Sequence, residues 1–147
     1  MSGIVGYIGK KESLQILFDG LARLEYRGYD SSGIAFVNGS GIDVYKSPGK
    51  LNELQKTLPT PLPAITTGIG HMRWATHGEP SAVNAHPHSA NRVSVVHNGI
   101  IENHRRLRSE LEAAGRVFTS QTDTEVVPQL IARHLESGLP IEEAIRR

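Results

Sequence analysis

Residues 34–45, IAFVNGSGIDVY, decide the fold class. Two runs of β-branched and aromatic residues, 34–37 and 42–45, flank the turn-forming segment 38–41, and this pattern predicts a β-hairpin. A hairpin joins antiparallel strands, whereas a parallel sheet needs a crossover between its strands. The sequence therefore predicts an α+β or layered α/β domain and not a purely parallel sheet.

The segments on either side alternate between strand and helix patterns. Strands are predicted at 4–8 and 66–72, and the apolar run 93–97 predicts the most clearly buried strand. Pro128 falls inside a helical pattern, so that helix is expected to kink or to begin late. A short extended segment is expected at 117–119 and a long functional loop at 73–92. Helices are predicted at 11–25, 50–58, 103–114, 122–134 and from Pro140 onward.

The composition excludes several classes of protein. The 147 residues suffice for one domain, and 16 Lys+Arg against 15 Asp+Glu leave a net charge of +1, which is not the basic signature of a nucleic-acid-binding protein. No apolar run approaches the ~18 residues of a membrane span. No secretory signal precedes the first strand, so we expect a cytoplasmic protein. The absence of cysteine excludes disulfides, thiolate metal sites and a cysteine nucleophile.

Five histidines lie in the middle of the chain: His71, His77, His86, His88 and His97. Neutral imidazoles bind zinc, and His86 and His88 would share one face of an extended segment. No carboxylate stands at a recognised spacing to complete such a site. The sequence therefore favours histidines that bond to backbone groups over a metal centre.

Two hypotheses concern a nucleophile. Ser2, His77 and Asp123 contain the residue types of a serine-hydrolase triad, although no Gly-x-Ser-x-Gly motif is present. Alternatively, removal of Met1 would give Ser2 a free α-amine, which is a base near neutral pH and can activate the side chain of its own residue. Gly3 would then permit close backbone approach.

A nucleophile at the terminus needs hydrogen-bond donors for an oxyanion. Asn98 and Gly99, just after the predicted strand 93–97, could supply a side-chain amide and a backbone N–H. A plain turn is the simpler interpretation of this pair when it is taken alone.

Six motifs extend this picture along the chain. They are SGIVG at 2–6, EYRGYDSSG at 25–33, GHMRWATHGEP at 70–80, NAHPH at 84–88, VHNGIIEN at 96–103 and TDTE at 122–125. In order and spacing, these motifs resemble the N-terminal-nucleophile (type 2) family of glutamine amidotransferases. Within it they resemble the glutaminase domains whose ammonia aminates fructose 6-phosphate. The family has a cysteine where this sequence has Ser2.

The resemblance implies an α+β fold, namely the N-terminal-nucleophile four-layer α/β/β/α sandwich. Because family domains are longer, residues 1–147 are expected to be a C-terminally truncated, partial glutaminase domain that lacks the isomerase domain. L-glutamine is the implied substrate, and it is hydrolysed to glutamate and ammonia without a metal or organic cofactor. Fructose 6-phosphate would be reached only through the absent domain. A homodimer is implied for full-length relatives, and no nucleic-acid or membrane partner is expected.

The resemblance also implies roles for individual residues. Asn98 and Gly99 would form the oxyanion hole beside Ser2, which stands at the nucleophile position. The substrate's α-carboxylate and α-ammonium would bind to a cation and an anion, and a loop would close over the ligand. The implied residues are Arg73 for the carboxylate, Asp123 for the ammonium, Trp74, Thr76 and His77 on the loop, Arg27 and Gly3 as supports, and His86 and His97 as structural members.

Ser2 changes the chemistry that the family performs. A hydroxyl is far less acidic than a thiol, so amide cleavage is expected to be strongly impaired or absent. An engineered substitution, a natural inactive relative and a working serine amidase remain open explanations. A glutamine-binding module without turnover and an inert fragment are the alternatives to an enzyme.

Overall fold

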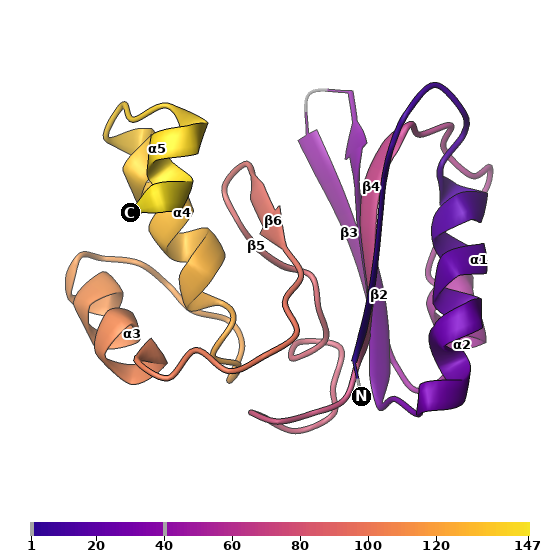
Figure 1. Ribbon diagram of the computed structural model, residues 1–147, viewed down its shortest axis with the longest axis horizontal. Helices are drawn as coiled ribbons and strands as arrows, with labels where there is room; N and C mark the ends of the chain where they lie inside the picture. Colours follow the sequence, from indigo (N-terminus) through magenta and orange to yellow (C-terminus); the bar gives the residue numbers. More distant parts are fainter. Residues whose placement is uncertain (1, 40) are drawn as a thin grey trace.

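The computed structural model describes residues 2–39 and 41–147, apart from the side chain of Arg27. Figure 1 shows four layers across the molecule: helices, a four-stranded sheet, a two-stranded hairpin and helices again. This is the α/β/β/α order that the family resemblance implied. The first layer consists of α1 (Leu14–Leu24) and α2 (Leu51–Lys56), and a short 3-10 turn, η1 (Glu25–Arg27), follows α1. The last layer consists of α3 (His104–Ala113), α4 (Val126–Glu136) and α5 (Ile141–Arg146).

The large sheet is entirely antiparallel, with strand order β1-β4-β2-β3. Its strands are β1 (Gly3–Ile8), β2 (Ser31–Asn38), β3 (Gly41–Pro48) and β4 (Thr67–Arg73). The pairing of Asn38 with Gly41 confirms the hairpin predicted at 34–45, although Ser40 of its turn lies outside the described residues. The small sheet pairs β5 (His88–Ala90) with β6 (Val93–Val95).

Alternation along β2 and β4 gives the large sheet two different faces. Ile34, Phe36 and Met72 belong to the core cluster formed with α1 and α2, which also contains Leu14 and Leu21. Successive strand residues point to opposite faces. The neighbours of these apolar residues therefore face the hairpin layer, and they include Gly33, Ala35, His71 and Arg73.

Most predicted elements are confirmed, with shifted boundaries. Helix α1 begins at Leu14 and not at residue 11. At this start, the carboxylate of Glu12 accepts the Leu14 N–H at 2.6 Å. Helix α4 begins late, as the proline predicted, because Pro128 lies in the first turn, where a backbone N–H has no partner within the helix.

Three predictions from the sequence are wrong. The strand expected at 93–97 ends at Val95 and is half-buried, because the hairpin layer is only two strands wide. Residues 88–90 form β5 inside the segment expected to be a loop, and 117–119 form no strand. Arg108 of α3 is half-buried. Its guanidinium lies 4.5 Å from the centroid of the Phe118 ring and donates to the carbonyl of Ser120.

Among the residues described, no helix is long and apolar enough to cross a membrane.

Candidate functional site

A small polar cleft lies where β1 begins, β4 ends and the loop after β4 starts. Its volume is about 40 Å³, which is room for one or two water molecules. Its lining comes from the residue before β1, from β4 and the loop after it, from the segments on either side of the small sheet and from the segment before α4: Ser2, His71, Arg73, Trp74, Thr76, His77, His86, His97, Gly99, Thr122, Asp123 and Thr124. The structure thus brings together most of the residues that the sequence singled out.

Ser2 stands at the edge of the sheet, one residue before β1. Gly3 pairs with Met72 across the β1–β4 ladder, which holds the terminus in the sheet. The Oγ of Ser2 accepts the backbone N–H of Trp74 at 2.9 Å. Met1 lies outside the described residues, as does the side chain of Arg27, so the expectations about the free α-amine and about Arg27 as a support stay predictions.

Arg73 is the buried cation of the cleft, with 3% of its surface exposed. Its guanidinium donates to the carbonyls of His77, of Gly78 at 3.1 Å and of Glu79 at 3.2 Å. These bonds fold the segment 77–79 back over the end of β4. They occupy three of five N–H donors, and the remaining two have no protein acceptor among the residues described.

Asp123 is the buried anion of the cleft and is also 3% exposed. Its Oδ2 accepts the N–H of Ile101 at 2.7 Å, and its Oδ1 lies 3.9 Å from the Nδ1 of His77. That separation is longer than a hydrogen bond. Ser2 bonds to Trp74 and not to His77. The geometry therefore lacks the hydrogen bonds of a Ser2–His77–Asp123 triad.

Trp74 and Thr76 continue the loop beside the cleft. The indole of Trp74 is half exposed and packs over Gly28, where an added Cβ would lie 2.9 Å from the ring. Gly28 has a φ of +76°, so the position favours glycine for two reasons. The hydroxyl of Thr76 lies 3.4 Å from the Nδ1 of His77.

Asn98 and Gly99 follow β6 on exposed backbone. The side-chain oxygen of Asn98 is 2.7 Å from the Nε2 of His71, which also lies 3.2 Å from the carbonyl of His97. Gly99 lines the cleft and has a φ of +151°, which favours glycine. Asn98 is therefore held by a side chain of β4, and the pair is not a free turn.

The histidines form a buried stack behind the cleft. The rings of His71 and His86 are parallel within 15°, with centroids 4.2 Å apart, and His88 meets His86 edge-on at 4.6 Å. Burial lowers the pKa of His71 to about 4 and that of His88 to about 3, and it lowers the pKa of His86 as well. The rings are therefore neutral at pH 7. The described residues contain no group of three side chains arranged to hold a metal ion.

Two carboxylates with structural roles in the site were missed by sequence reasoning. Asp30 accepts the N–H of Ala75 and lies 3.7 Å from Arg73. Glu125 is 2% exposed and accepts the backbone N–H groups of Thr119 at 2.8 Å and Ser120 at 2.6 Å, which shapes the segment that presents Asp123. Both belong to motifs quoted from the sequence, but only the fold reveals their partners.

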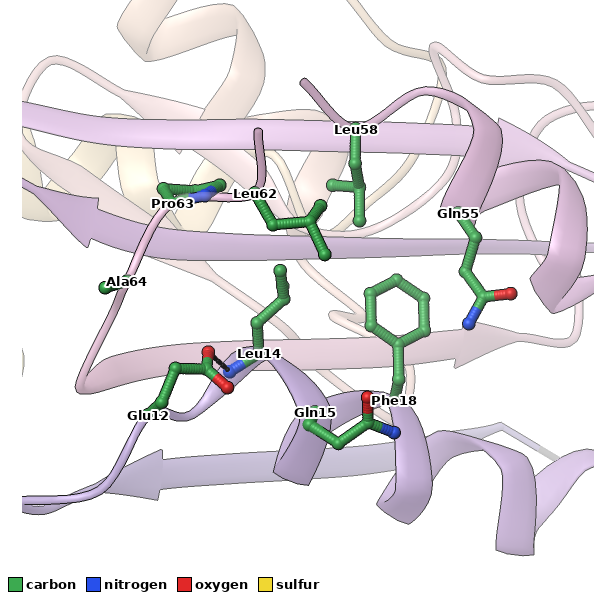
Figure 2. Close-up of a pocket in the computed structure, with 9 residues that line it drawn as sticks. All are labelled: Glu12, Leu14, Gln15, Phe18, Gln55, Leu58, Leu62, Pro63 and Ala64. Carbon is green, nitrogen blue, oxygen red and sulfur yellow. Dashed lines mark hydrogen bonds between the residues drawn. The ribbon is translucent and has the colours of Figure 1, made fainter. Parts of the chain in front are cut away.

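A second hollow lies on the opposite face of the large sheet. Figure 2 shows it between α1, α2 and the segment 58–64. Its volume is about 390 Å³. Its wall includes the apolar side chains of Leu14, Phe18, Leu58 and Leu62. The carboxylate of Glu12 is already engaged by the N–H of Leu14. This hollow presents neither paired charges nor a nucleophile, so the polar cleft is the candidate site.

Comparison with known proteins finds similarity to glutamine amidotransferases. A family model described as "Glutamine amidotransferase domain" matches residues 71–143. The glutamine–fructose-6-phosphate aminotransferase (isomerizing) of Symbiobacterium thermophilum is 56% identical over 149 residues, which cover 100% of this chain and 24% of that protein. The enzyme of the same name from Streptomyces coelicolor is 53% identical and covers 99% of this chain and 24% of its own length.

Solved structures agree on the fold. Glutamine phosphoribosylpyrophosphate amidotransferase from B. subtilis, complexed with ADP and GMP, superposes with a TM-score of 0.79 at 28% identity. The structure of the allosteric regulatory enzyme of purine biosynthesis superposes with a TM-score of 0.81 at 28% identity. Each match covers 99% of this chain and 32% of the other. The chain spans about a quarter of the length of the aminotransferases that it matches.

Proposed function

Because the chain belongs to the glutamine amidotransferase family, we propose that its polar cleft binds L-glutamine and that the residue at position 2 attacks the side-chain amide. One observation carries the proposal. A guanidinium and a carboxylate, those of Arg73 and Asp123, are each 3% exposed and line the same cleft as Ser2. Two opposite buried charges complement the carboxylate and ammonium of an α-amino acid.

The free donors of Arg73 suit the α-carboxylate. Two of its N–H groups have no protein acceptor among the described residues, and a guanidinium pairs well with a planar carboxylate. Asp123 keeps its Oδ1 free of short contacts, since His77 lies 3.9 Å away, and this oxygen would accept from the α-ammonium.

The cleft has to open before glutamine can enter. A space of about 40 Å³ holds water but not an amino acid. The loop of Trp74, Thr76 and His77 is the part that would move. Its carbonyls at 77–79 are held by Arg73, the same group that would bind the substrate, so ligand binding and loop position are coupled in this proposal.

The reaction would proceed by acyl transfer to residue 2. The side-chain nucleophile attacks the amide carbon of glutamine, and its proton passes to the α-amine of residue 2. The carbonyl oxygen becomes an oxyanion stabilised by the amide of Asn98 and the N–H of Gly99. The α-amine then protonates the departing ammonia. Water next attacks the γ-glutamyl ester or thioester, which releases glutamate and restores the nucleophile. With the hydroxyl of Ser2, the first step is slow.

The wider role is part of the same proposal. As a partial glutaminase domain of a longer protein, residues 1–147 would supply ammonia for the amination of fructose 6-phosphate by an isomerase domain. The homodimer and the cytoplasmic location expected from the sequence stay predictions.

A second candidate function is glutamine binding without turnover. It is favoured by the weak nucleophile, because Ser2 leaves the binding charges in place while removing the thiol on which the family's chemistry depends.

Calorimetry and an assay of glutamate release separate these functions. We expect the chain to bind glutamine, and we expect Ser2→Cys to hydrolyse it much faster than the unchanged chain. Ser89→Cys, which puts a thiol on an exposed strand position, is the matched control and should not gain activity. Binding with no turnover in Ser2→Cys would support the binding module. Absence of binding would overturn both functions.

A further inference from the structure

His71 makes the contact that fixes Asn98. It lies in β4, is 1% exposed and places its Nε2 2.7 Å from the Oδ1 of Asn98 and 3.2 Å from the carbonyl of His97. A backbone carbonyl only accepts hydrogen bonds, so Nε2 carries the proton of the neutral ring. A protonated Nε2 also requires that the Asn98 atom facing it be the oxygen.

That arrangement leaves the other half of the Asn98 amide available. No partner for the Nδ2 of Asn98 is found in the described part of the chain, so both of its N–H groups are free to donate. Donation from a fixed amide stabilises an oxyanion because the dipole needs no reorganisation during the reaction.

The ring of His71 is itself fixed. It stacks on His86, whose Nδ1 accepts the N–H of His97 at 3.3 Å, so ring and backbone bonds tie β4 to the segment that ends in Asn98. The Nδ1 of His71 is buried and has no partner among the residues described. An unpaired buried acceptor destabilises the fold, and an apolar side chain would avoid that penalty. The Nε2–H contacts explain why a histidine occupies the position.

We propose that His71 is a positioning residue for amide cleavage, which holds the oxygen of Asn98 so that the Asn98 amide nitrogen faces the oxyanion formed at residue 2. This inference rests on the proposed function. His71 touches no reacting atom and acts through Asn98.

Kinetics in the Ser2→Cys background tests the role. His71→Leu should lower kcat about 10- to 100-fold and leave KM unchanged, because an oxyanion donor is worth about 10²–10³ in rate and the groups that bind the amino acid are untouched. His71→Gln, which restores an N–H donor of similar reach, should recover most of the loss. Met72→Leu, a buried change on the other face of β4, is the control for general disturbance and should keep kcat.

A double-mutant cycle separates positioning from a merely structural role. In an Asn98→Ala background, His71→Leu should lower kcat no further, because its effect passes through the missing amide. An undiminished loss of kcat in that background, or an equal loss in His71→Gln and His71→Leu, would overturn the proposal.

Nuclear magnetic resonance gives a readout that does not depend on activity. The His71 ring should be the Nε2–H tautomer at pH 7, and Asn98→Asp should raise its pKa, because a carboxylate would replace the amide oxygen beside it. An Nδ1–H tautomer, or a pKa indifferent to Asn98→Asp, overturns the positioning role even if Ser2→Cys is active. If the Nε2–H tautomer and the raised pKa were both observed but Ser2→Cys did not hydrolyse glutamine, the proposed function would be refuted and the contact between His71 and Asn98 would stand.

Discussion

Met72 and Arg73 are neighbours in β4 and are 2% and 3% exposed, yet they point to opposite faces of the sheet. Met72 joins an apolar cluster with α1 and α2. Arg73 instead donates to three backbone carbonyls, beside a stack of histidines and a buried aspartate. Both residues are buried, but Met72 depends on hydrophobic packing, whereas Arg73 depends on hydrogen bonds to specific polar partners.

Because of this difference, the stability contributed by the hairpin-side face depends on pH, whereas the stability contributed by the apolar face does not. An apolar cluster carries no titratable group. The histidine stack consists of neutral rings whose pKa values are lowered by burial. Predictions that compare the two faces therefore begin with pH.

Acid should destabilise the fold through the hairpin-side face. In the unfolded chain a histidine has a pKa of about 6.5, whereas His71 titrates at about 4 and His88 at about 3 in the fold. Between these pH values the unfolded state binds more protons than the folded state. The contribution of these histidines to the free energy of unfolding is therefore fully present above pH 6.5 and falls as the pH drops toward 4. From pH 7 to 5 we expect a loss of about 2 kcal/mol for each ring of the stack, measured by urea unfolding.

The slope of the unfolding free energy against pH, which measures the protons taken up on unfolding, can be assigned to individual rings. His88→Gln should reduce it by about one proton, since one such group titrates only in the unfolded state. Ser89→Gln, which changes the exposed position next to His88 and adds or removes no titratable group, should leave it unchanged. A slope that is the same in all three proteins would show that the stack is not the acid-sensitive element.

The two faces also differ in how far the sequence predicts them. The hairpin at 34–45 and the helix with Leu14, Leu17 and Leu21 follow from local alternation and spacing, so the apolar side was predictable. β5 was missed because its pairing with β6 is decided by tertiary contacts and its flanking histidines and prolines resemble a loop.

The site was predictable as a set of residues but not as a network of contacts. Family motifs pointed to Ser2, Arg73 and Asp123, which do line one cleft. The bond from His71 to Asn98 joins residues 27 positions apart, and no periodicity signals such a bond. Glu125 likewise gives no sign in the sequence that its carboxylate folds back onto Thr119 and Ser120.

Gly33→Ala should affect the hairpin-side face next most strongly. A Cβ at this position would lie 2.0 Å from the backbone oxygen of His86, so the segment that carries the histidine stack must move away from the sheet. We expect a loss of about 1–3 kcal/mol in the free energy of unfolding and weaker glutamine binding. Gly41→Ala in β3, where a Cβ meets nothing within 4 Å, is the control. Equal stability of the two variants would mean that the layers approach less closely than described.

Ser31 and Ser32 allow the smallest and most direct comparison, because they are adjacent in β2, fully buried and on opposite faces. Ser31 donates to the carboxylate of Asp30 at 2.9 Å, so Ser31→Ala should cost about 1 kcal/mol by breaking a satisfied bond. Ser32 pairs across the sheet with Met72, and its Oγ has no partner among the described residues. Ser32→Ala removes an unpaired polar atom from an apolar face and should stabilise the fold by up to about 1 kcal/mol. Thermal unfolding of the two variants measures both signs. If Ser32→Ala proved as destabilising as Ser31→Ala, the α1 face would depend on a polar contact after all, and the contrast between the two faces would fail at that point.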